Sequence, residues 1–265
     1  MRHWIATASI LMLLSTPVVA AAPARAQSEA SNKPTIVLVH GAFSGSSSWN
    51  AVITDLTADG YTVIAAANPL RSLQGDAAYV ASLVKSVPGP VVLVGHSYGG
   101  EVISVAAAGR TNVKALVFIA GLAPDVGESA ASLGAQFPTG TLGETLAPPV
   151  PLTDGSSDLY IQRPRYWQQF AADVPKADAV QMAATQRPIV QSALGEPAAV
   201  QSWKTLPSWF IWGSLDRNIP AALHAYMAKR AGARAAIEVK GASHVVMITH
   251  SRAVADLIER ASTAK

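Results

Sequence analysis

The sequence predicts an α/β fold in which a mostly parallel sheet is covered by helices on both faces. Two observations support this prediction. Short apolar runs rich in Val, Ile and Leu, typical of buried strands, alternate with longer stretches of helical pattern. Such an alternation forms consecutive parallel strands joined by helices. The 265 residues are also enough for a domain of this class with a sizeable core.

The predicted elements follow one another in a regular order. Strands are expected at residues 35–39, 61–65, 90–94, 113–119, 208–212 and 235–239. Helices are expected at residues 48–58, 76–87, 101–108, 221–231 and 251–261. Gly60 and Gly109 follow two of these helices, where glycine commonly ends a helix.

The first 26 residues have the pattern of a secretory signal peptide. Arg2 and His3 precede an apolar run that extends to Leu14, and Ala24-Arg25-Ala26 is a small-x-small cleavage site. The apolar run is too short for a membrane span, and an uncleaved anchor is the alternative. We therefore expect cleavage after Ala26 and a periplasmic or secreted mature protein without stable membrane insertion.

The composition excludes several classes of function. Removing residues 1–26 removes Arg2 and Arg25 but no acidic residue, so the net charge falls from +3 to +1. This small charge and the absence of a basic cluster from the sequence argue against nucleic-acid binding. The chain has no cysteine, which excludes a cysteine nucleophile, a thiolate metal site and an iron–sulfur cluster.

Residues 122–206 interrupt the alternation of strands and helices. They are rich in Pro and Gly up to Pro151 and then become helical and aromatic. We expect a cap inserted into a domain at 35–265, which follows a polar linker at 27–34. A cap over a sheet edge excludes water and shapes a substrate pocket. The alternative for its aromatic residues is that they fill only the cap's own small core.

The residues Gly95-His96-Ser97-Tyr98-Gly99-Gly100 contain the pattern Gly-x-Ser-x-Gly. The predicted strand 90–94 precedes them and the predicted helix 101–108 follows, so Ser97 is expected at a sharp strand-to-helix turn. Glycine is needed at the flanking positions because a Cβ there would collide with neighbouring backbone. This arrangement is typical of a serine nucleophile.

A serine nucleophile needs a base within hydrogen-bond reach and a carboxylate that orients the base. His244 is the candidate base because it follows the last predicted strand, at the edge where active-site residues of parallel sheets gather. The alternative is a loop histidine near solvent. Asp216 is the candidate acid because it follows the strand 208–212 and precedes His244 by 28 residues, enough for one helix and one strand. Asp125 is the competing acid, and otherwise it caps a turn.

The remaining histidines of the mature chain have other expected places. His40 and His96 lie in the motif turns, His224 lies within a predicted helix, and His250 begins the last one. We expect His96 to be a structural residue that packs behind the serine turn.

The tetrahedral intermediate formed on a serine nucleophile needs two backbone N–H donors for its oxyanion. One is expected from Tyr98, directly after the serine, and the other from Ala42, in the loop after the first predicted strand. Gly41 allows the chain to turn so that the Ala42 amide points inward. The alternative for His40-Gly41 is a plain turn at a strand end.

These segments resemble the α/β-hydrolase superfamily, in particular the branch of plant methyl esterases and hydroxynitrile lyases. The resemblance is carried by Val37-Leu38-Val39-His40-Gly41-Ala42, Trp49, the serine motif, Asp216-Arg217-Asn218-Ile219-Pro220 and Gly241-Ala242-Ser243-His244. It spans nearly the whole mature chain and is weakest in the cap. It implies an α/β-hydrolase fold, a Ser-His-Asp triad, an oxyanion hole at Ala42 and Tyr98, and no cofactor.

Two positions separate the members of this branch. The lyases carry a lysine directly after the catalytic histidine and tend to carry glutamate before the serine, whereas this chain has Val245 and His96. Esterase members have an apolar residue and a histidine there. We therefore expect a carboxylic ester hydrolase for a small apolar or aromatic ester. The alternatives are a lyase, a C–C hydrolase, a cofactor-free haloperoxidase, or a ligand-binding protein on the same scaffold.

Overall fold

The computed structural model describes Met1 and residues 33–264 of the chain. The predicted signal peptide beyond Met1, and the predicted linker up to residue 32, lie outside the described residues, so export stays a prediction. In the part of the chain that is described, no helix has the length and apolar character needed to cross a bilayer.

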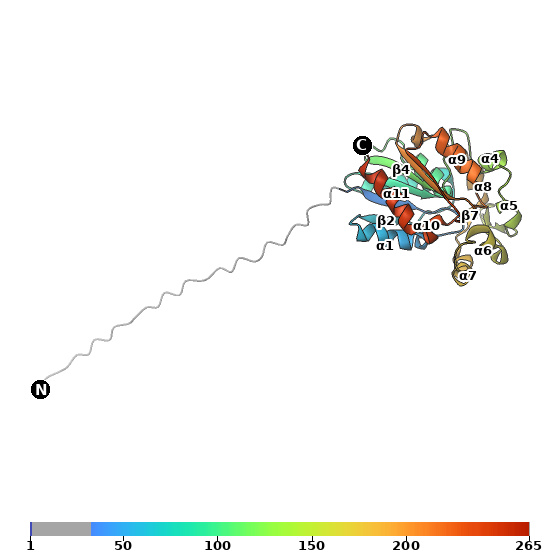
Figure 1. Ribbon diagram of the computed structural model, residues 1–265, viewed down its shortest axis with the longest axis horizontal. Helices are drawn as coiled ribbons and strands as arrows, with labels where there is room; N and C mark the ends of the chain where they lie inside the picture. Colours follow the sequence, from blue (N-terminus) through green and yellow to red (C-terminus); the bar gives the residue numbers. More distant parts are fainter. Residues whose placement is uncertain (2–32, 265) are drawn as a thin grey trace. The chain divides into compact units, whose positions relative to one another are not determined.

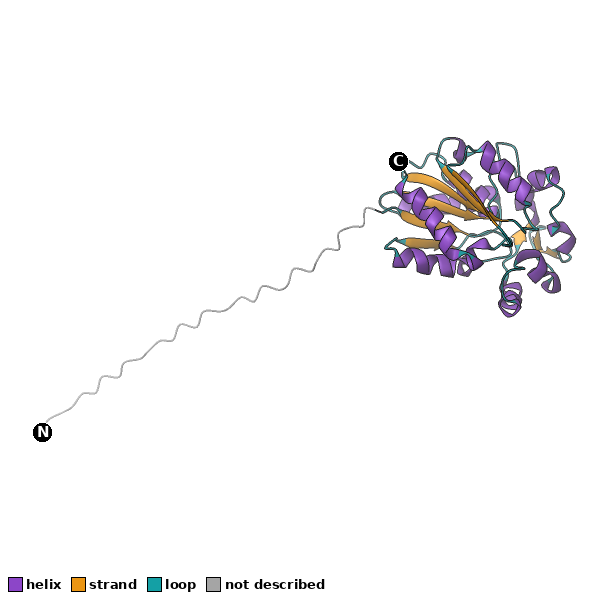
Figure 2. Ribbon diagram, viewed as in Figure 1, coloured by secondary structure: helices purple, strands orange, loops and turns teal. Residues whose placement is uncertain are grey.

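A six-stranded sheet forms the centre of the domain (Figure 2). Its strands are β1 (Thr35–Val39), β2 (Val63–Ala66), β3 (Val91–His96), β4 (Val113–Ile119), β8 (Ser208–Gly213) and β9 (Ala235–Val239). Their order across the sheet is β2-β1-β3-β4-β8-β9, and each neighbouring pair is parallel. The predicted fold class is therefore confirmed.

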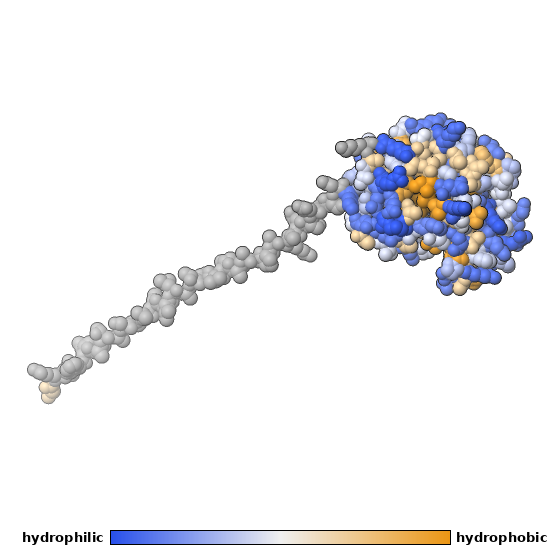
Figure 3. Space-filling view, in the orientation of Figure 1, coloured by the Kyte–Doolittle hydropathy of each residue, from blue (hydrophilic) through white to orange (hydrophobic). Residues whose placement is uncertain are grey.

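Helices pack against this sheet (Figure 1). They are η1 (Ser46–Trp49), α1 (Asn50–Ala58), α2 (Leu73–Ser86), α3 (Tyr98–Ala106), α9 (Ala221–Arg230), α10 (Val246–Thr249) and α11 (Ser251–Thr263). One layer contains α1 and α11, with α11 against β3, β4 and β8. The other contains α2 and α3, with α3 against β1, β3 and β4, while α9 covers β8 and β9. The buried residues of the longer helices α1, α2, α3, α9 and α11 are mostly apolar. The face shown in Figure 3 is largely hydrophilic around a smaller hydrophobic area.

The burial of the strands explains their sequence patterns. Every residue of β3 and β8 is buried, because helices cover both faces of a central parallel strand, and their sequences are accordingly mostly apolar. The edge strand β9 instead alternates between partly buried and exposed residues. Some helices begin earlier than predicted: α2 begins at Leu73 because the Ser72 hydroxyl accepts a hydrogen bond from Gly75 N at 3.1 Å and caps the helix.

The segment between β4 and β8 contains short helices and a small sheet. The helices are α4 (Ala130–Gln136), α5 (Leu142–Thr145), α6 (Arg163–Phe170), α7 (Lys176–Thr185), α8 (Gln191–Gly195) and η2 (Ser202–Lys204). The antiparallel strands are β5 (Val150–Pro151), β6 (Ser157–Leu159) and β7 (Ile189–Val190). The sequence does not predict this small sheet because strands of two or three residues leave no detectable periodicity. An ion pair of 2.7 Å between Arg71 and Asp158 ties the segment to the loop before α2.

Candidate active site

Ser97 lies at the turn between β3 and α3, with φ 55° and ψ −126°. A residue other than glycine keeps such a conformation only when its surroundings hold it there. Here Ser97 O accepts hydrogen bonds from Gly100 N at 2.9 Å and from Leu122 N at 3.0 Å. A Cβ on Gly95 would stand 2.7 Å from Gly100 N, so only glycine allows the strand and helix to meet this closely. The local sequence therefore creates the turn that presents the Ser97 hydroxyl.

His244 and Asp216 come from the loops that follow β9 and β8. The Nδ1–H of His244 donates a hydrogen bond of 2.7 Å to Asp216 Oδ2. The two loops are in direct contact, since a Cβ on Gly213 would stand 2.6 Å from the carbonyl carbon of Ala242. Glycine at position 213 therefore lets the two loops approach closely enough for His244 to contact Asp216.

The Asp216 carboxylate accepts hydrogen bonds at both oxygens. Its Oδ1 accepts from the backbone N–H of Asn218 at 2.8 Å and of Ile219 at 3.0 Å. Its Oδ2 accepts a second hydrogen bond, from His224 Nε2 at 3.1 Å. Burial acts to raise the pKa of Asp216, but the two histidines outweigh it and hold this pKa below its ordinary value. Asp216 is consequently ionised at neutral pH.

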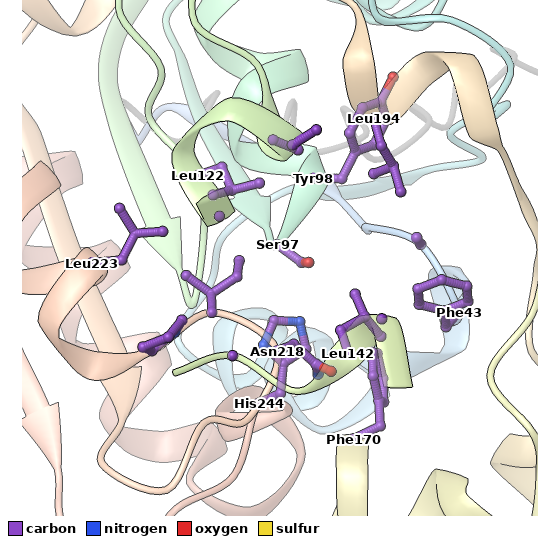
Figure 4. A pocket seen from close by; sticks show the side chains of 18 of the residues that line it. Phe43, Ser97, Tyr98, Leu122, Leu142, Phe170, Leu194, Asn218, Leu223 and His244 are labelled. Carbon is purple, nitrogen blue, oxygen red and sulfur yellow. The ribbon is translucent and has the colours of Figure 1, made fainter. Parts of the chain in front are cut away.

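The His244 ring faces the Ser97 hydroxyl across the pocket floor (Figure 4). Its other contacts hold the ring in this orientation. His96 Nε2 donates to His244 O at 3.2 Å, and the His96 ring lies 4.7 Å from the His244 ring. Phe170 of α6 packs edge-on at 5.0 Å. Burial lowers the pKa of His96 well below its ordinary value, so it is a neutral packing residue behind the serine turn.

Ala42 and Tyr98 line the same pocket as Ser97. A Cβ on Gly41 would stand 2.7 Å from the Ser97 Cβ and 3.1 Å from Tyr98 N, so the segment before Ala42 lies against the serine turn. His40, at its start, is fully buried, and burial lowers its pKa to about 4. The structure thus brings together the two backbone segments that the sequence predicts as oxyanion donors.

The pocket above these residues has a volume of about 290 Å³. Its walls come from both the sheet edge and the cap, and they are almost entirely apolar. They include Phe43, Leu122, Phe137, Leu142, Leu146, Phe170, Leu194, Ile219 and Leu223. Asn218, Ser97 and His244 are polar side chains that line the pocket, and no charged Lys, Arg, Asp or Glu is among the described residues that do so. Because Phe170 also packs on His244, the cap's aromatic residues do more than fill a core of their own.

The competing acid, Asp125, does not meet His244. Its two oxygens lie 2.9 Å from Lys204 Nζ, and its Oδ1 accepts from Val126 N at 2.8 Å. The hydrogen bond from Lys204 lowers the pKa of Asp125. Asp125 therefore belongs to an exposed turn, as the alternative predicted.

Sequence reasoning missed the contact of His224 with Asp216. His224 lies in α9, eight residues after Asp216, and the helical pattern there predicts only a core position. The signal was present in the short spacing: Pro220 starts the helix, so its first turns pack directly beside the loop that holds Asp216. Within residues 33–264, no group of three or more His, Asp or Glu side chains is arranged to hold a metal ion.

The chain matches the model of the alpha/beta hydrolase family over residues 36–257 and therefore belongs to this family. A search of curated proteins finds no match.

Solved structures of several enzymes share the fold. Polyneuridine aldehyde esterase is similar with a TM-score of 0.74 and 19% identity, over 86% of this chain and 98% of that chain. An extracellular α/β-hydrolase from a Paenibacillus species, which shares homology with tobacco salicylic acid binding protein 2, has a TM-score of 0.72 and 20% identity, over 87% of this chain and 100% of that chain. Tomato methylketone synthase I complexed with 2-tridecanone has a TM-score of 0.73 and 19% identity, over 88% of this chain and 99% of that chain. Together with the family match, these likenesses confirm the predicted α/β-hydrolase fold.

Proposed function

We propose that this alpha/beta hydrolase cleaves small uncharged carboxylic esters with Ser97 as nucleophile, His244 as base and Asp216 as the orienting acid. The observation that carries the proposal is the 2.7 Å hydrogen bond from His244 to Asp216 beside a pocket that Ser97 also lines. A carboxylate, an imidazole and a hydroxyl in this order are the parts that acyl transfer from an ester requires. The polyneuridine aldehyde esterase and the extracellular α/β-hydrolase among the similar structures support the same class of reaction.

In the first half of the proposed reaction, His244 accepts the proton of the Ser97 hydroxyl while Oγ bonds to the carbonyl carbon of the ester. The carbonyl π electrons move to the oxygen, and the N–H groups of Ala42 and Tyr98 hold the resulting oxyanion. When the intermediate collapses, the bond to the alkoxy oxygen breaks. His244 gives its proton to that oxygen, the alcohol leaves, and the acyl group stays on Ser97.

The second half repeats these steps with water. His244 takes a proton from water, whose oxygen bonds to the acyl carbon, and the same two N–H groups hold the oxyanion. Collapse breaks the bond to Oγ, His244 returns its proton to Ser97, and the carboxylic acid leaves. Asp216 stays ionised throughout, holds Nδ1–H of His244, and stabilises the imidazolium formed in each half.

The pocket walls support an ester as the substrate over a cyanohydrin. Val245, the position that follows His244, is fully buried and is not among the residues that line the pocket. It therefore supplies no cation for a departing anion such as cyanide. An apolar pocket that carries only neutral polar groups instead suits an uncharged acyl group.

A covalent probe and an ester test this proposal together. We expect a fluorophosphonate, which bonds to activated serine hydroxyls, to label Ser97 once per chain, and we expect the protein to hydrolyse p-nitrophenyl butyrate. Ser97→Ala should remove the label and lower kcat/KM by on the order of 10⁴ or more, because the nucleophile is gone. Peptide mass spectrometry and initial rates provide the measurements.

Ser104→Ala is the matched control for this test. Ser104 lies on the same helix as the serine turn, is fully buried, and its hydroxyl has no hydrogen-bond partner among the described residues. Its alanine variant should keep both the label and the turnover. Hydrolysis at the native rate by Ser97→Ala, or a label on another residue, would contradict the proposal.

A further inference from the structure

We propose that His224 is a positioning residue that shares the Asp216 carboxylate with His244 and so limits how strongly this carboxylate holds a proton on His244. The proposal rests on the function proposed above for Ser97, His244 and Asp216. It assigns to His224 a role in tuning the base, beyond its place in the core.

The first argument is the geometry around one oxygen atom. Asp216 Oδ2 accepts hydrogen bonds from His244 Nδ1 at 2.7 Å and from His224 Nε2 at 3.1 Å. The backbone N–H groups of Asn218 and Ile219 occupy Oδ1. A carboxylate accepts about four hydrogen bonds, so Asp216 is saturated and cannot turn. His224 is the side chain that competes with His244 for the same oxygen.

The second argument is the setting of the His224 ring. Its side chain is 1% exposed, and it stacks on Trp212 at 5.7 Å with 21° between the rings. Its Nδ1 has no hydrogen-bond partner among the described residues. A buried imidazole with one bare nitrogen costs stability that an aliphatic side chain of the same shape would avoid. The hydrogen bond to Asp216 is thus the contact that distinguishes histidine from an apolar residue here.

The third argument is charge. Burial lowers the pKa of His224, so the ring is neutral and donates through Nε2–H. The titratable side chain that packs on the Asp216–His244–His224 array is His96, whose ring lies 4.7 Å from the His244 ring and is kept neutral by burial, which lowers its pKa. A neutral donor on Oδ2 draws negative charge away from the bond to His244. Without this donor, more of the negative charge on Oδ2 acts on the hydrogen bond from His244.

The test compares two variants of matched shape. Gln places its amide nitrogen where His carries Nε2, whereas Met has the same length and no donor. The rate of Ser97 labelling by a fluorophosphonate is measured against pH in the native protein, in His224→Gln and in His224→Met. In His224→Met we expect the midpoint of the acid limb to move about half to one pH unit higher. The limiting rate should fall roughly threefold to tenfold, because Asp216 loses one of the contacts that keep it from turning and so orients His244 less firmly. His224→Gln should stay close to the native protein in both.

A control variant, a replacement variant and the contrary results keep the test decisive. His250→Gln, at a histidine that does not line the pocket and whose Nδ1 contacts Thr249, should leave the midpoint unchanged. If His224→Met does not fold, His224→Asn replaces it, because the shorter amide does not reach Asp216. An unchanged midpoint in His224→Met with a lowered melting temperature, or an equal shift in the Gln and Met variants, would overturn the inference. No labelling of the native protein would instead overturn the proposed function.

Discussion

Glu101 is a buried carboxyl group that the proposed reaction does not use. It lies in the first turns of α3, has no exposed surface, and neither of its oxygens has a hydrogen-bond partner among the described residues. Burial, together with the negative charge of Glu196, raises the pKa of Glu101 well above its ordinary value. The raised pKa favours the neutral acid in the folded protein, within the helix that follows Ser97.

The raised pKa of Glu101 makes the stability of the protein depend on pH. The folded state binds this proton more tightly than the unfolded state, in which a glutamate has a pKa of about 4.3. The free energy of unfolding therefore falls as the pH rises from the pKa of the unfolded state through the pKa of the folded state. Glu101→Gln removes the ionisation and keeps the shape. We expect its melting temperature to exceed that of the native protein by an amount that grows from pH 5 to pH 9. Glu144→Gln, at an exposed position of the short helix α5, is the control, and a difference that stays constant with pH would refute this interpretation.

At the scale of elements, helix α6 of the cap holds the segment that carries Ala42. The hydroxyl of Tyr166 donates a hydrogen bond of 2.8 Å to Phe43 O, and Phe43 N donates to Arg187 O at 2.8 Å. Phe43 has a φ of 60°, which a residue other than glycine adopts only when such contacts fix it. The cap therefore takes part in shaping the backbone beside the serine turn as well as in covering the pocket.

Tyr166→Phe should weaken catalysis more than binding. The change leaves Phe43 O without its donor, and the segment beside the oxyanion loses one of its constraints. We expect kcat for p-nitrophenyl butyrate to fall about threefold to tenfold with little change in KM, because the affected contact acts when the oxyanion forms. Tyr160→Phe, in the cap but outside this contact, should leave both constants at their native values. An equal loss of kcat in the two variants would show that the hydrogen bond from the Tyr166 hydroxyl to Phe43 O has no specific role in catalysis.

At the scale of the whole molecule, the cap and the sheet edge enclose a small neutral space. About 290 Å³ is near the lower end of the range for small-molecule pockets, and the described residues around it carry no Lys, Arg, Asp or Glu side chain. A charged group that enters this space loses its hydration without gaining a partner. Size and charge together should therefore select the substrate.

A series of p-nitrophenyl esters measures this selection. We expect kcat/KM to be highest for short neutral acyl groups, to fall steeply for the dodecanoate, and to be at least about tenfold lower for the hemisuccinate than for the butyrate, because its free carboxylate must be desolvated. Labelling of Ser97 by an uncharged probe is the control, because it shows that the site is intact. Equal rates for the hemisuccinate and the butyrate would contradict the proposed pocket.

The serine turn and the strand pattern are local, and the sequence alone predicted both. Glycines around Ser97 and apolar runs before each helix follow from short-range backbone geometry and from burial on both faces of a sheet. The sheet order and the small sheet of the cap were not predictable in this way. They depend on contacts between distant residues or on strands too short to leave a pattern.

The sequence by itself therefore determined the class of fold, the position of Ser97, and Asp216 and His244 as candidates. Only the tertiary structure decided that Asp216, and not Asp125, meets His244, that His224 shares its carboxylate, and that α6 supports the segment beside Ala42. The physical reason is that hydrogen bonds act over about 3 Å. Which loops come that close at the sheet edge is settled by the packing of the whole domain and not by the residues of any one loop.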